Sequence, residues 1–179
     1  MPTTLPLPFT PALRWMLAAL LAAAAALASA PAQSQTTAPV WAKGSTLVLN
    51  ANDAKGQRLD VASLRKQVVV VFVWSTGCAV CRDSLPELRA NAAGWQAKPF
   101  TLVAVNVDAR AEDWSRYEAL VGQTLMPTKN WQSVRLEGAI PAGQRLPLTL
   151  LVDTQGKIIQ RFEGRLAPEV WDGVAELLP

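Results

Sequence analysis

The two cysteines of this 179-residue chain, Cys78 and Cys81, are spaced for redox chemistry. Residues 68–73 are a continuous apolar run, mostly valine, with the length and composition of a strand buried on both faces. Residues 75–77 (Ser-Thr-Gly) interrupt this strand, and helix-compatible residues follow from Ala79. We therefore expect Cys78 just before the first turn of a helix, and Cys81 inside that turn.

A cysteine pair at the start of a helix can exchange disulfides with other proteins. The unpaired N–H groups and the positive end of the helix dipole stabilise a thiolate at Cys78, and a thiolate is the form that attacks a disulfide. Two other uses of the pair fit less well. A structural disulfide would close so small a ring that it would remove little chain entropy. A zinc site usually needs four ligands, and the chain has no histidine and no third cysteine.

Residues 74–81 (WSTGCAVC), with Pro86 following, resemble the active-site segment of the thioredoxin superfamily. The more specific similarity is to exported thiol-disulfide oxidoreductases of the TlpA/ResA type, whose segment reads roughly W-A-[ST]-W-C-x-x-C-x-x-x-x-P. The resemblance implies an enzyme in which Cys78 is the attacking thiolate and Cys81 the resolving thiol. It also implies an α/β, thioredoxin-like fold: a central mixed sheet flanked by helices, with an N-terminal β-hairpin extension.

Hydrophobic periodicity places the remaining elements in an order compatible with that fold. A second buried strand at residues 101–107 follows the cysteine helix, so the two strands should run parallel with a right-handed crossover. One face of the next helix is expected to carry Trp114, Tyr117, Leu120 and Val121, and its two aromatic side chains are expected in the core. The predicted elements are a hairpin (46–50 and 58–61), a strand (68–73), a helix interrupted by proline (79–97), a strand (101–107), a helix (108–121), a short strand (133–136), two hairpin strands (148–153 and 157–163) and a last helix (168–178).

A proline before a later strand completes the site that the resemblance implies. In the family a cis-proline lies against the cysteine pair, and the segment LPLTLLVDTQGKI makes Pro147 its counterpart. The main chain at Leu146 would pair with an extended segment of the partner protein, a form of strand addition. Trp74, Gly77, Leu146 and Pro147 are thus the expected substrate-binding residues.

The sequence departs from the family pattern at three places. Gly77 stands where relatives usually have tryptophan, which removes a bulky wall beside the first cysteine. Phe72 stands where thioredoxins have a buried acid, so the usual proton acceptor for the second cysteine is missing. The dipeptide Ala79-Val80 lacks both the proline of reductants and the Pro-His of strong oxidants. The acids considered as replacements are Glu112, Asp113 and Glu137, and Arg82 is interpreted as a solvated side chain.

The first 40 residues have the pattern of an export signal and a linker. Arg14 precedes an apolar run at residues 15–27, and Ala28-Ser29-Ala30 supplies the small residues of a cleavage site. The alternative is a retained membrane anchor, although the run is shorter than the roughly 20 residues of a membrane span. We expect a periplasmic protein, with a signal peptide at 1–30, a disordered linker at 31–40 and one thioredoxin-like domain at 41–179.

Charge and composition argue against other classes of partner. Removal of residues 1–30 takes away one arginine and no acidic residue, which lowers the net charge from +3 to +2. That charge is too small and too scattered for nucleic-acid binding. The expected partners are exported proteins with cysteines or disulfides, together with a membrane thiol electron donor. The thiol chemistry itself needs no cofactor and no metal.

The direction of the reaction stays open between several functions. We favour a reductant, as in relatives that keep exported cysteines reduced, and the alternative is a disulfide oxidant or isomerase of secreted proteins. A different class is a Cu(I)-handling protein, since a thiolate pair can hold this soft ion. Related copper chaperones add a histidine, which this chain lacks. A third class is a redox-inert interaction domain.

Overall fold

The computed structural model describes residues 40–122 and 128–179, which belong to one compact unit. The predicted signal peptide at residues 1–30, and residues 31–39 of the predicted linker, lie outside the described residues. Within the two described ranges, no helix combines the length and the apolar character needed to cross a membrane.

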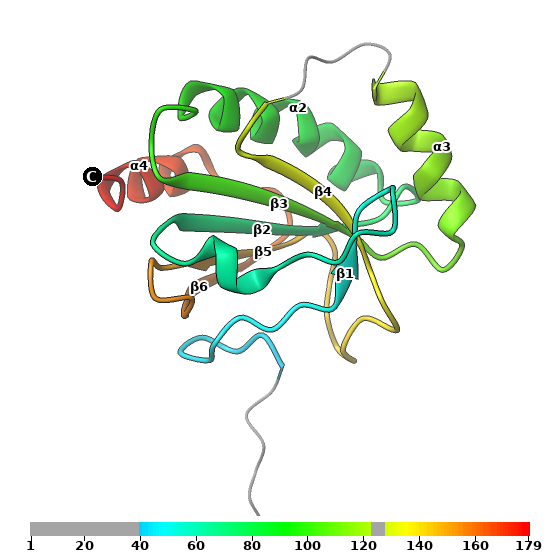
Figure 1. The fold of residues 1–179 in the computed structure, drawn as a ribbon, viewed down its shortest axis with the longest axis horizontal. Coiled ribbons are helices and arrows are strands. Elements are labelled where there is room, and N and C mark those ends of the chain that lie inside the picture. Colours follow the sequence, from blue (N-terminus) through cyan, green and yellow to red (C-terminus); the bar gives the residue numbers. More distant parts are fainter. Residues whose placement is uncertain (1–39, 123–127) are drawn as a thin grey trace, which may run out of the picture. The chain divides into compact units, whose positions relative to one another are not determined.

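A six-stranded mixed sheet organises the described residues (Figure 1). Its order is β1-β4-β3-β2-β5-β6, and β2, β3 and β4 are parallel to one another. The predicted mixed sheet and its central parallel pair are thus confirmed. The strands are β1 (Ala51–Asn52), β2 (Val68–Trp74), β3 (Phe100–Asn106), β4 (Trp131–Leu136), β5 (Leu148–Val152) and β6 (Ile158–Glu163). The helices are α2 (Ala79–Gly94), α3 (Ala111–Gly122) and α4 (Pro168–Glu176).

Alternate side chains of β2 enter two separate hydrophobic clusters. Phe72 and Trp74 face the side of the sheet that the helices cover (Figure 1). Val71 and Val73 face the opposite side, which the N-terminal residues 41–64 cover. Both faces of β2 are therefore sealed from water, which explains why all seven of its residues are buried and apolar. The strand that leads into the cysteine turn is therefore buried along its whole length.

The N-terminal segment covers one sheet face without forming the full hairpin that the sequence predicts. A single bridge joins Asn52 to Arg58 around the predicted turn. The strand β1 is limited to Ala51–Asn52 and pairs with β4, and Val61–Leu64 form a 3₁₀ helix, η1, instead of a second hairpin strand. The segment lies across the sheet because its leucines bury their side chains there: Leu47, Leu49, Leu59 and Leu64.

The helix α3 begins later than predicted and buries less of its length. It starts at Ala111 because Asp108 uses its N–H and its carboxylate in hydrogen bonds outside the helix. Trp114 is buried as predicted, whereas Leu120, expected on the same face of the helix, is 61% exposed. Smaller differences are the end of α2 at Gly94 instead of residue 97, the start of β4 at Trp131 instead of residue 133, and the end of α4 at Glu176 instead of residue 178.

Replacement of Leu102 by alanine should lower the free energy of unfolding by about 2–5 kcal/mol. Leu102 is 0% exposed in β3 and packs in the cluster beneath the helices, so the substitution leaves a cavity. The matched control is Leu120→Ala, the same substitution at a site that is 61% exposed. It should change the free energy by less than about 0.5 kcal/mol. Equilibrium unfolding in urea measures both, and equal losses would contradict the assignment of the core.

Candidate active site

The two cysteines form a disulfide at the N-terminus of α2. Their Sγ atoms are 2.11 Å apart and their Cα atoms 5.2 Å apart. Cys78 is the N-cap residue of the helix, and its Sγ accepts a hydrogen bond from the N–H of Cys81 at 3.1 Å. The positions predicted for them, before and inside the first helical turn, are confirmed.

The two cysteines differ in their exposure to solvent. Cys78 is half-buried, whereas Cys81 is 0% exposed. An incoming disulfide or thiol can therefore reach the first sulfur and not the second. The N–H groups of the first helical turn also lie beside the sulfur of Cys78, where they favour a thiolate after reduction. Both features suit Cys78 to the attacking role and Cys81 to the resolving role.

Apolar side chains surround the buried cysteine. Phe72, Leu85 and Leu88 belong to the same cluster as Cys81. Burial among such side chains disfavours a charged thiolate at this position. In the described parts of the chain, no three His, Cys, Asp or Glu side chains gather where they could hold a metal ion.

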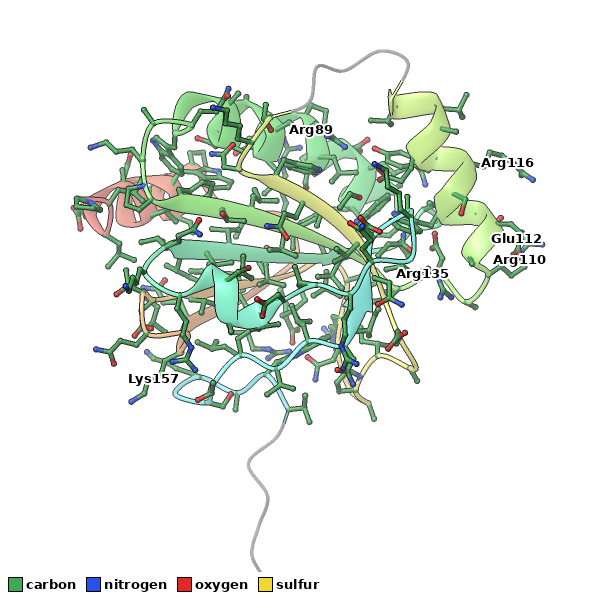
Figure 2. All side chains as sticks on the ribbon, in the orientation of Figure 1. Arg89, Arg110, Glu112, Arg116, Arg135 and Lys157 are labelled. Carbon is green, nitrogen blue, oxygen red and sulfur yellow. A yellow bond between two sulfur atoms is a disulfide. The ribbon has the colours of Figure 1, made fainter. Side chains whose placement is uncertain are left out.

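The three acids considered as replacements for an acid at Phe72 have other surroundings. Glu112 is exposed on the first turn of α3 and points away from the sheet (Figure 2). Asp113 pairs with Arg110 at 2.8 Å. Glu137 accepts a hydrogen bond from Asn52 Nδ2 at 2.7 Å, at the β1–β4 edge. The carboxylates of Asp113 and Glu137 are thus engaged by other partners, and Glu112 faces solvent.

The turn that carries Cys78 is held from two sides. The N–H of Cys78 donates to the carbonyl of Ser75 at 3.1 Å and closes the turn. The N–H of Thr76 donates to Asp108 Oδ1 at 2.9 Å, and the guanidinium of Arg82 donates to the carbonyl of Thr76. Arg82 is therefore not simply solvated, as the sequence suggested. Asp108 was missed, although a polar residue just after a buried strand is a signal that could have found it.

A groove of about 540 Å³ lies beside the cysteine turn. Its walls bring together Gly77 and Leu146, which are far apart in the sequence, and the loop after β3. The bond between Leu146 and Pro147 is cis, which confirms the prediction for this proline. Pairing of β5 with its two neighbours begins just beyond, at Leu148. Three of the four predicted substrate-binding residues thus belong to the groove or adjoin it.

The fourth, Trp74, has a different environment. Its side chain is 1% exposed, and its ring makes an edge contact with Tyr117 of α3, with centroids 4.8 Å apart. Burial removes this side chain from any surface that a partner could contact, which argues against the predicted binding role. Trp74 instead anchors the end of β2 in the core.

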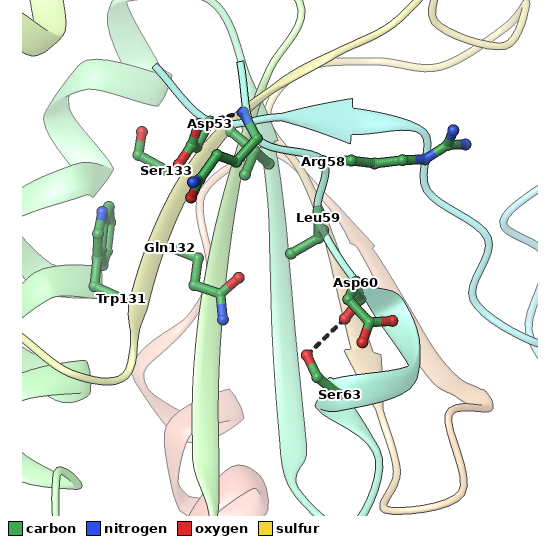
Figure 3. Close-up of a pocket in the computed structure, with 10 residues that line it drawn as sticks. Asp53, Arg58, Leu59, Asp60, Ser63, Trp131, Gln132 and Ser133 are labelled. Atoms are coloured by element: carbon green, nitrogen blue, oxygen red, sulfur yellow. Dashed lines mark hydrogen bonds between the residues drawn. The ribbon is translucent and has the colours of Figure 1, made fainter. Parts of the chain in front are cut away.

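A second hollow, of about 380 Å³, lies between the loop after β1 and the strand β4 (Figure 3). Its charged groups serve local structure. The carboxylate of Asp53 accepts from two backbone N–H groups, that of Asp60 caps η1, and Arg58 donates to Asn50. Neither cysteine lines this hollow. The cysteine turn and its groove therefore stand as the candidate active site.

Sequence comparisons agree with this geometry. The AhpC/TSA family matches residues 44–171. The thiol-disulfide oxidoreductase ResA of Bacillus thuringiensis subsp. konkukian (strain 97-27) is 22% identical over 121 residues, covering 65% of this chain and 66% of that protein. ResA of Bacillus anthracis is 21% identical over 133 residues, covering 68% of this chain and 69% of that protein. The chain thus spans 66% of the length of the first of these relatives.

Solved structures show the same fold. A thiol:disulfide interchange protein from Bacteroides sp. matches with a TM-score of 0.60 and 24% identity, covering 75% of this chain and 89% of that one. A putative thiol-disulfide oxidoreductase from Bacteroides vulgatus matches with a TM-score of 0.63 and 16% identity, covering 78% and 99%. The predicted thioredoxin-like architecture is confirmed by these similarities.

Proposed function

The chain belongs to the AhpC/TSA family, and we propose that it is a thiol-disulfide oxidoreductase whose working group is the Cys78–Cys81 pair. The asymmetry of the pair carries this proposal, because the sulfur that caps α2 is accessible and its partner is 0% exposed. A disulfide that only stapled the fold would not need this asymmetry. It would also close too short a loop to stabilise the chain much.

The proposed reaction transfers two electrons from the pair to a partner disulfide. The thiolate of Cys78 attacks one partner sulfur, the partner S–S bond breaks, and the second partner sulfur leaves as a thiolate that takes a proton from water. Cys81 then gives its proton to water and attacks Sγ of Cys78 as a thiolate. The bond between Cys78 and the first partner sulfur breaks, that sulfur leaves as a thiolate that takes a proton from water, and the Cys78–Cys81 disulfide forms. A thiol electron donor must reduce that disulfide before the next cycle.

The groove beside Cys78 supports a role in holding the partner. Gly77 and Leu146 line it, and the main chain at Leu146 precedes the first paired residue of β5, Leu148. An extended partner segment that lies along Leu146 and Pro147 would bring its own sulfur beside Cys78, as in strand addition. We propose Gly77, Leu146 and Pro147 as its contacts.

A Gly77→Trp substitution should slow the attack on protein disulfides and leave the attack on a small disulfide nearly unchanged. Gly77 is exposed, and a Cβ at this position would meet no atom within 4 Å, so the larger side chain should be tolerated by the fold. An indole there would occupy part of the groove. Gly77→Ala is the control, with rates close to wild type. The measurement compares rate constants for an insulin disulfide and for oxidised glutathione. Equal slowing of both would contradict a steric role.

We further propose that the chain acts outside the cytoplasm as a reductant. The predicted signal peptide supports export. The relatives named thiol-disulfide oxidoreductase ResA support thiol-disulfide exchange as the reaction. Its partners would be exported proteins with cysteines or disulfides, and a membrane thiol carrier would supply electrons. Fractionation of cells into periplasm, membrane and cytoplasm tests the location, and N-terminal sequencing tests cleavage after Ala30.

The reduction potential of the pair decides the direction. Trp74 shares a hydrophobic cluster with Cys81 and packs near Cys78, so tryptophan fluorescence should report the redox state. Equilibration of the purified protein with glutathione buffers should give a value near or below about −230 mV for a reductant. A value near about −120 mV would contradict that direction and indicate an oxidant or isomerase. A pair that does not react with glutathione at all would contradict the proposed activity.

A further inference from the structure

We infer that Asp108 is a positioning residue for Cys78. The carboxylate of Asp108 holds the turn that carries this cysteine, and it thereby sets the redox equilibrium of the pair. The inference rests on the proposed function. It concerns a side chain whose hydrogen bonds go to the turn and to the end of β3 rather than to a sulfur.

In the turn from Ser75 to Cys78, side chains hold both peptide groups that adjoin Thr76. Its N–H donates to Asp108 Oδ1 at 2.9 Å. Its carbonyl accepts from the guanidinium of Arg82, which lies on α2. Rotation at Thr76 would move Cys78 relative to the helix that Cys78 caps. These two bonds therefore fix where the sulfur of Cys78 stands over the first helical turn.

Asp108 is itself held in place by Asn106, which is buried, and by Arg135. Its Oδ2 accepts from Asn106 Nδ2 at 3.0 Å, and its N–H donates to Asn106 Oδ1 at 3.0 Å. Asn106 is 0% exposed at the end of β3. Arg135 of β4 donates to the carbonyl of Asp108 at 2.8 Å. The two carboxylate oxygens thus serve two donors on different elements, and an amide would place an NH2 group, itself a donor, against one of these two donors.

Removal of this carboxylate should act on the redox pair in two ways with the same sign. A freed turn would hold the two sulfurs together for less of the time, so the effective concentration of one thiol at the other would fall and the disulfide would weaken. Loss of a negative charge from the groove beside Cys78 would also favour its thiolate. Both effects favour the reduced pair.

The test compares redox equilibria of Asp108 variants with two matched controls in the full chain. Asp113→Asn removes a charge from the same groove, but Asp113 bonds to Arg110 instead of the turn. Asp153→Ala removes a carboxylate that also holds a turn, through the N–H groups of Gln155 and Lys157 at 2.9 Å each. Asp153 follows Val152, which pairs with Val69 near the start of β2, at the end of the sheet away from the cysteines.

Asp108→Ala should shift the equilibrium with glutathione about tenfold toward the reduced pair, equivalent to about 30 mV. Asp108→Asn, which keeps one acceptor, should shift it less, but more than twofold. Asp113→Asn should shift it less than Asp108→Asn, because it removes charge from the groove without freeing the turn. Asp153→Ala should stay within twofold of wild type, although it will lower stability. If Asp108→Ala does not fold, the comparison of Asp108→Asn with the two controls decides in the same way.

Three results would overturn the inference. An Asp108→Asn equilibrium within twofold of wild type would show that the carboxylate does not position the turn. An equal shift in Asp113→Asn would assign the effect to charge alone, and an equal shift in Asp153→Ala would assign it to general loss of stability. Failure of the wild-type pair to react with glutathione would count against the proposed function itself. A reactive wild type with unshifted Asp108 variants would count against this inference only.

Discussion

A Cys81→Ser variant should accumulate as a covalent complex with its partner and turn over no substrate. Its Cys78 keeps the half-buried position and the N–H groups of the first helical turn, so attack on a partner disulfide remains possible. The resolving sulfur is gone, and the mixed disulfide cannot be released from within the protein. The reduced variant is incubated with insulin and analysed by non-reducing electrophoresis and mass spectrometry. A stoichiometric adduct should appear, and an added thiol should cleave it by reducing the mixed disulfide.

The reciprocal variant, Cys78→Ser, is the matched control. It retains one cysteine as well, but Cys81 is 0% exposed and sits among apolar side chains. We expect no adduct over the same time and no turnover. Adducts that form equally fast in both variants would contradict the assignment of Cys78 as the attacking residue, because exposure would then not control reactivity.

Replacement of Phe72 by aspartate should lower the free energy of unfolding at pH 7 by at least about 3 kcal/mol. Phe72 is 1% exposed and packs in the cluster that includes Cys81. The substitution removes a large buried ring and places a carboxyl in an apolar setting. Thioredoxins carry a buried acid at this place, whereas in this chain the side chain packs with the apolar residues of that cluster.

The loss in Phe72→Asp should depend on pH with a definite sign. Burial raises the pKa of the introduced carboxyl, so the folded state keeps its proton at a pH where the unfolded chain has released it, above about 4. The free energy of unfolding should then fall as pH rises from 4 toward 7. The control is Phe72→Asn, which has nearly the same shape and no titratable group.

Urea unfolding at pH 4 and pH 7 separates the two variants. The asparagine variant should lose a similar amount at both values, relative to wild type, because nothing at position 72 titrates. The difference between the aspartate and asparagine variants should be larger at pH 7 than at pH 4. If that difference is the same at both pH values, the surroundings of position 72 are hydrated. This result would contradict the apolar surroundings that Phe72 and Cys81 share.

The local part of the site could be predicted from the sequence because it is encoded in one short stretch. A buried strand, three turn residues and a helix start at Ala79 follow one another, and each leaves a clear pattern of residue types. Their order alone places Cys78 at the cap and Cys81 inside the helix. The cis bond at Pro147 was also found, but only through the resemblance to a family, since nothing in the residues themselves distinguishes it from a trans bond.

The parts that escaped prediction depend on contacts between distant segments. Asp108 reaches Thr76 from 32 residues away in the sequence, and no periodic pattern encodes such a pair. The N-terminal segment has the alternation and the turn residues of a hairpin, yet its leucines bury against the sheet face and displace most of the strand pairing. Leu120 had helical spacing, but its side of α3 faces solvent because the helix packs through Trp114.

The cover on the second sheet face also constrains when the protein can finish folding. Thr46 is bridged to Lys157, and the N–H of Gly44 donates to the carbonyl of Ile158 at 2.7 Å, so the first part of the domain closes against nearly the last. In a chain that is synthesised N-terminus first, these contacts of Gly44 and Thr46 cannot form until β6 has been made. The last strand of the sheet therefore completes the cover on this face, and the domain cannot reach its full set of contacts before residue 158 has been made.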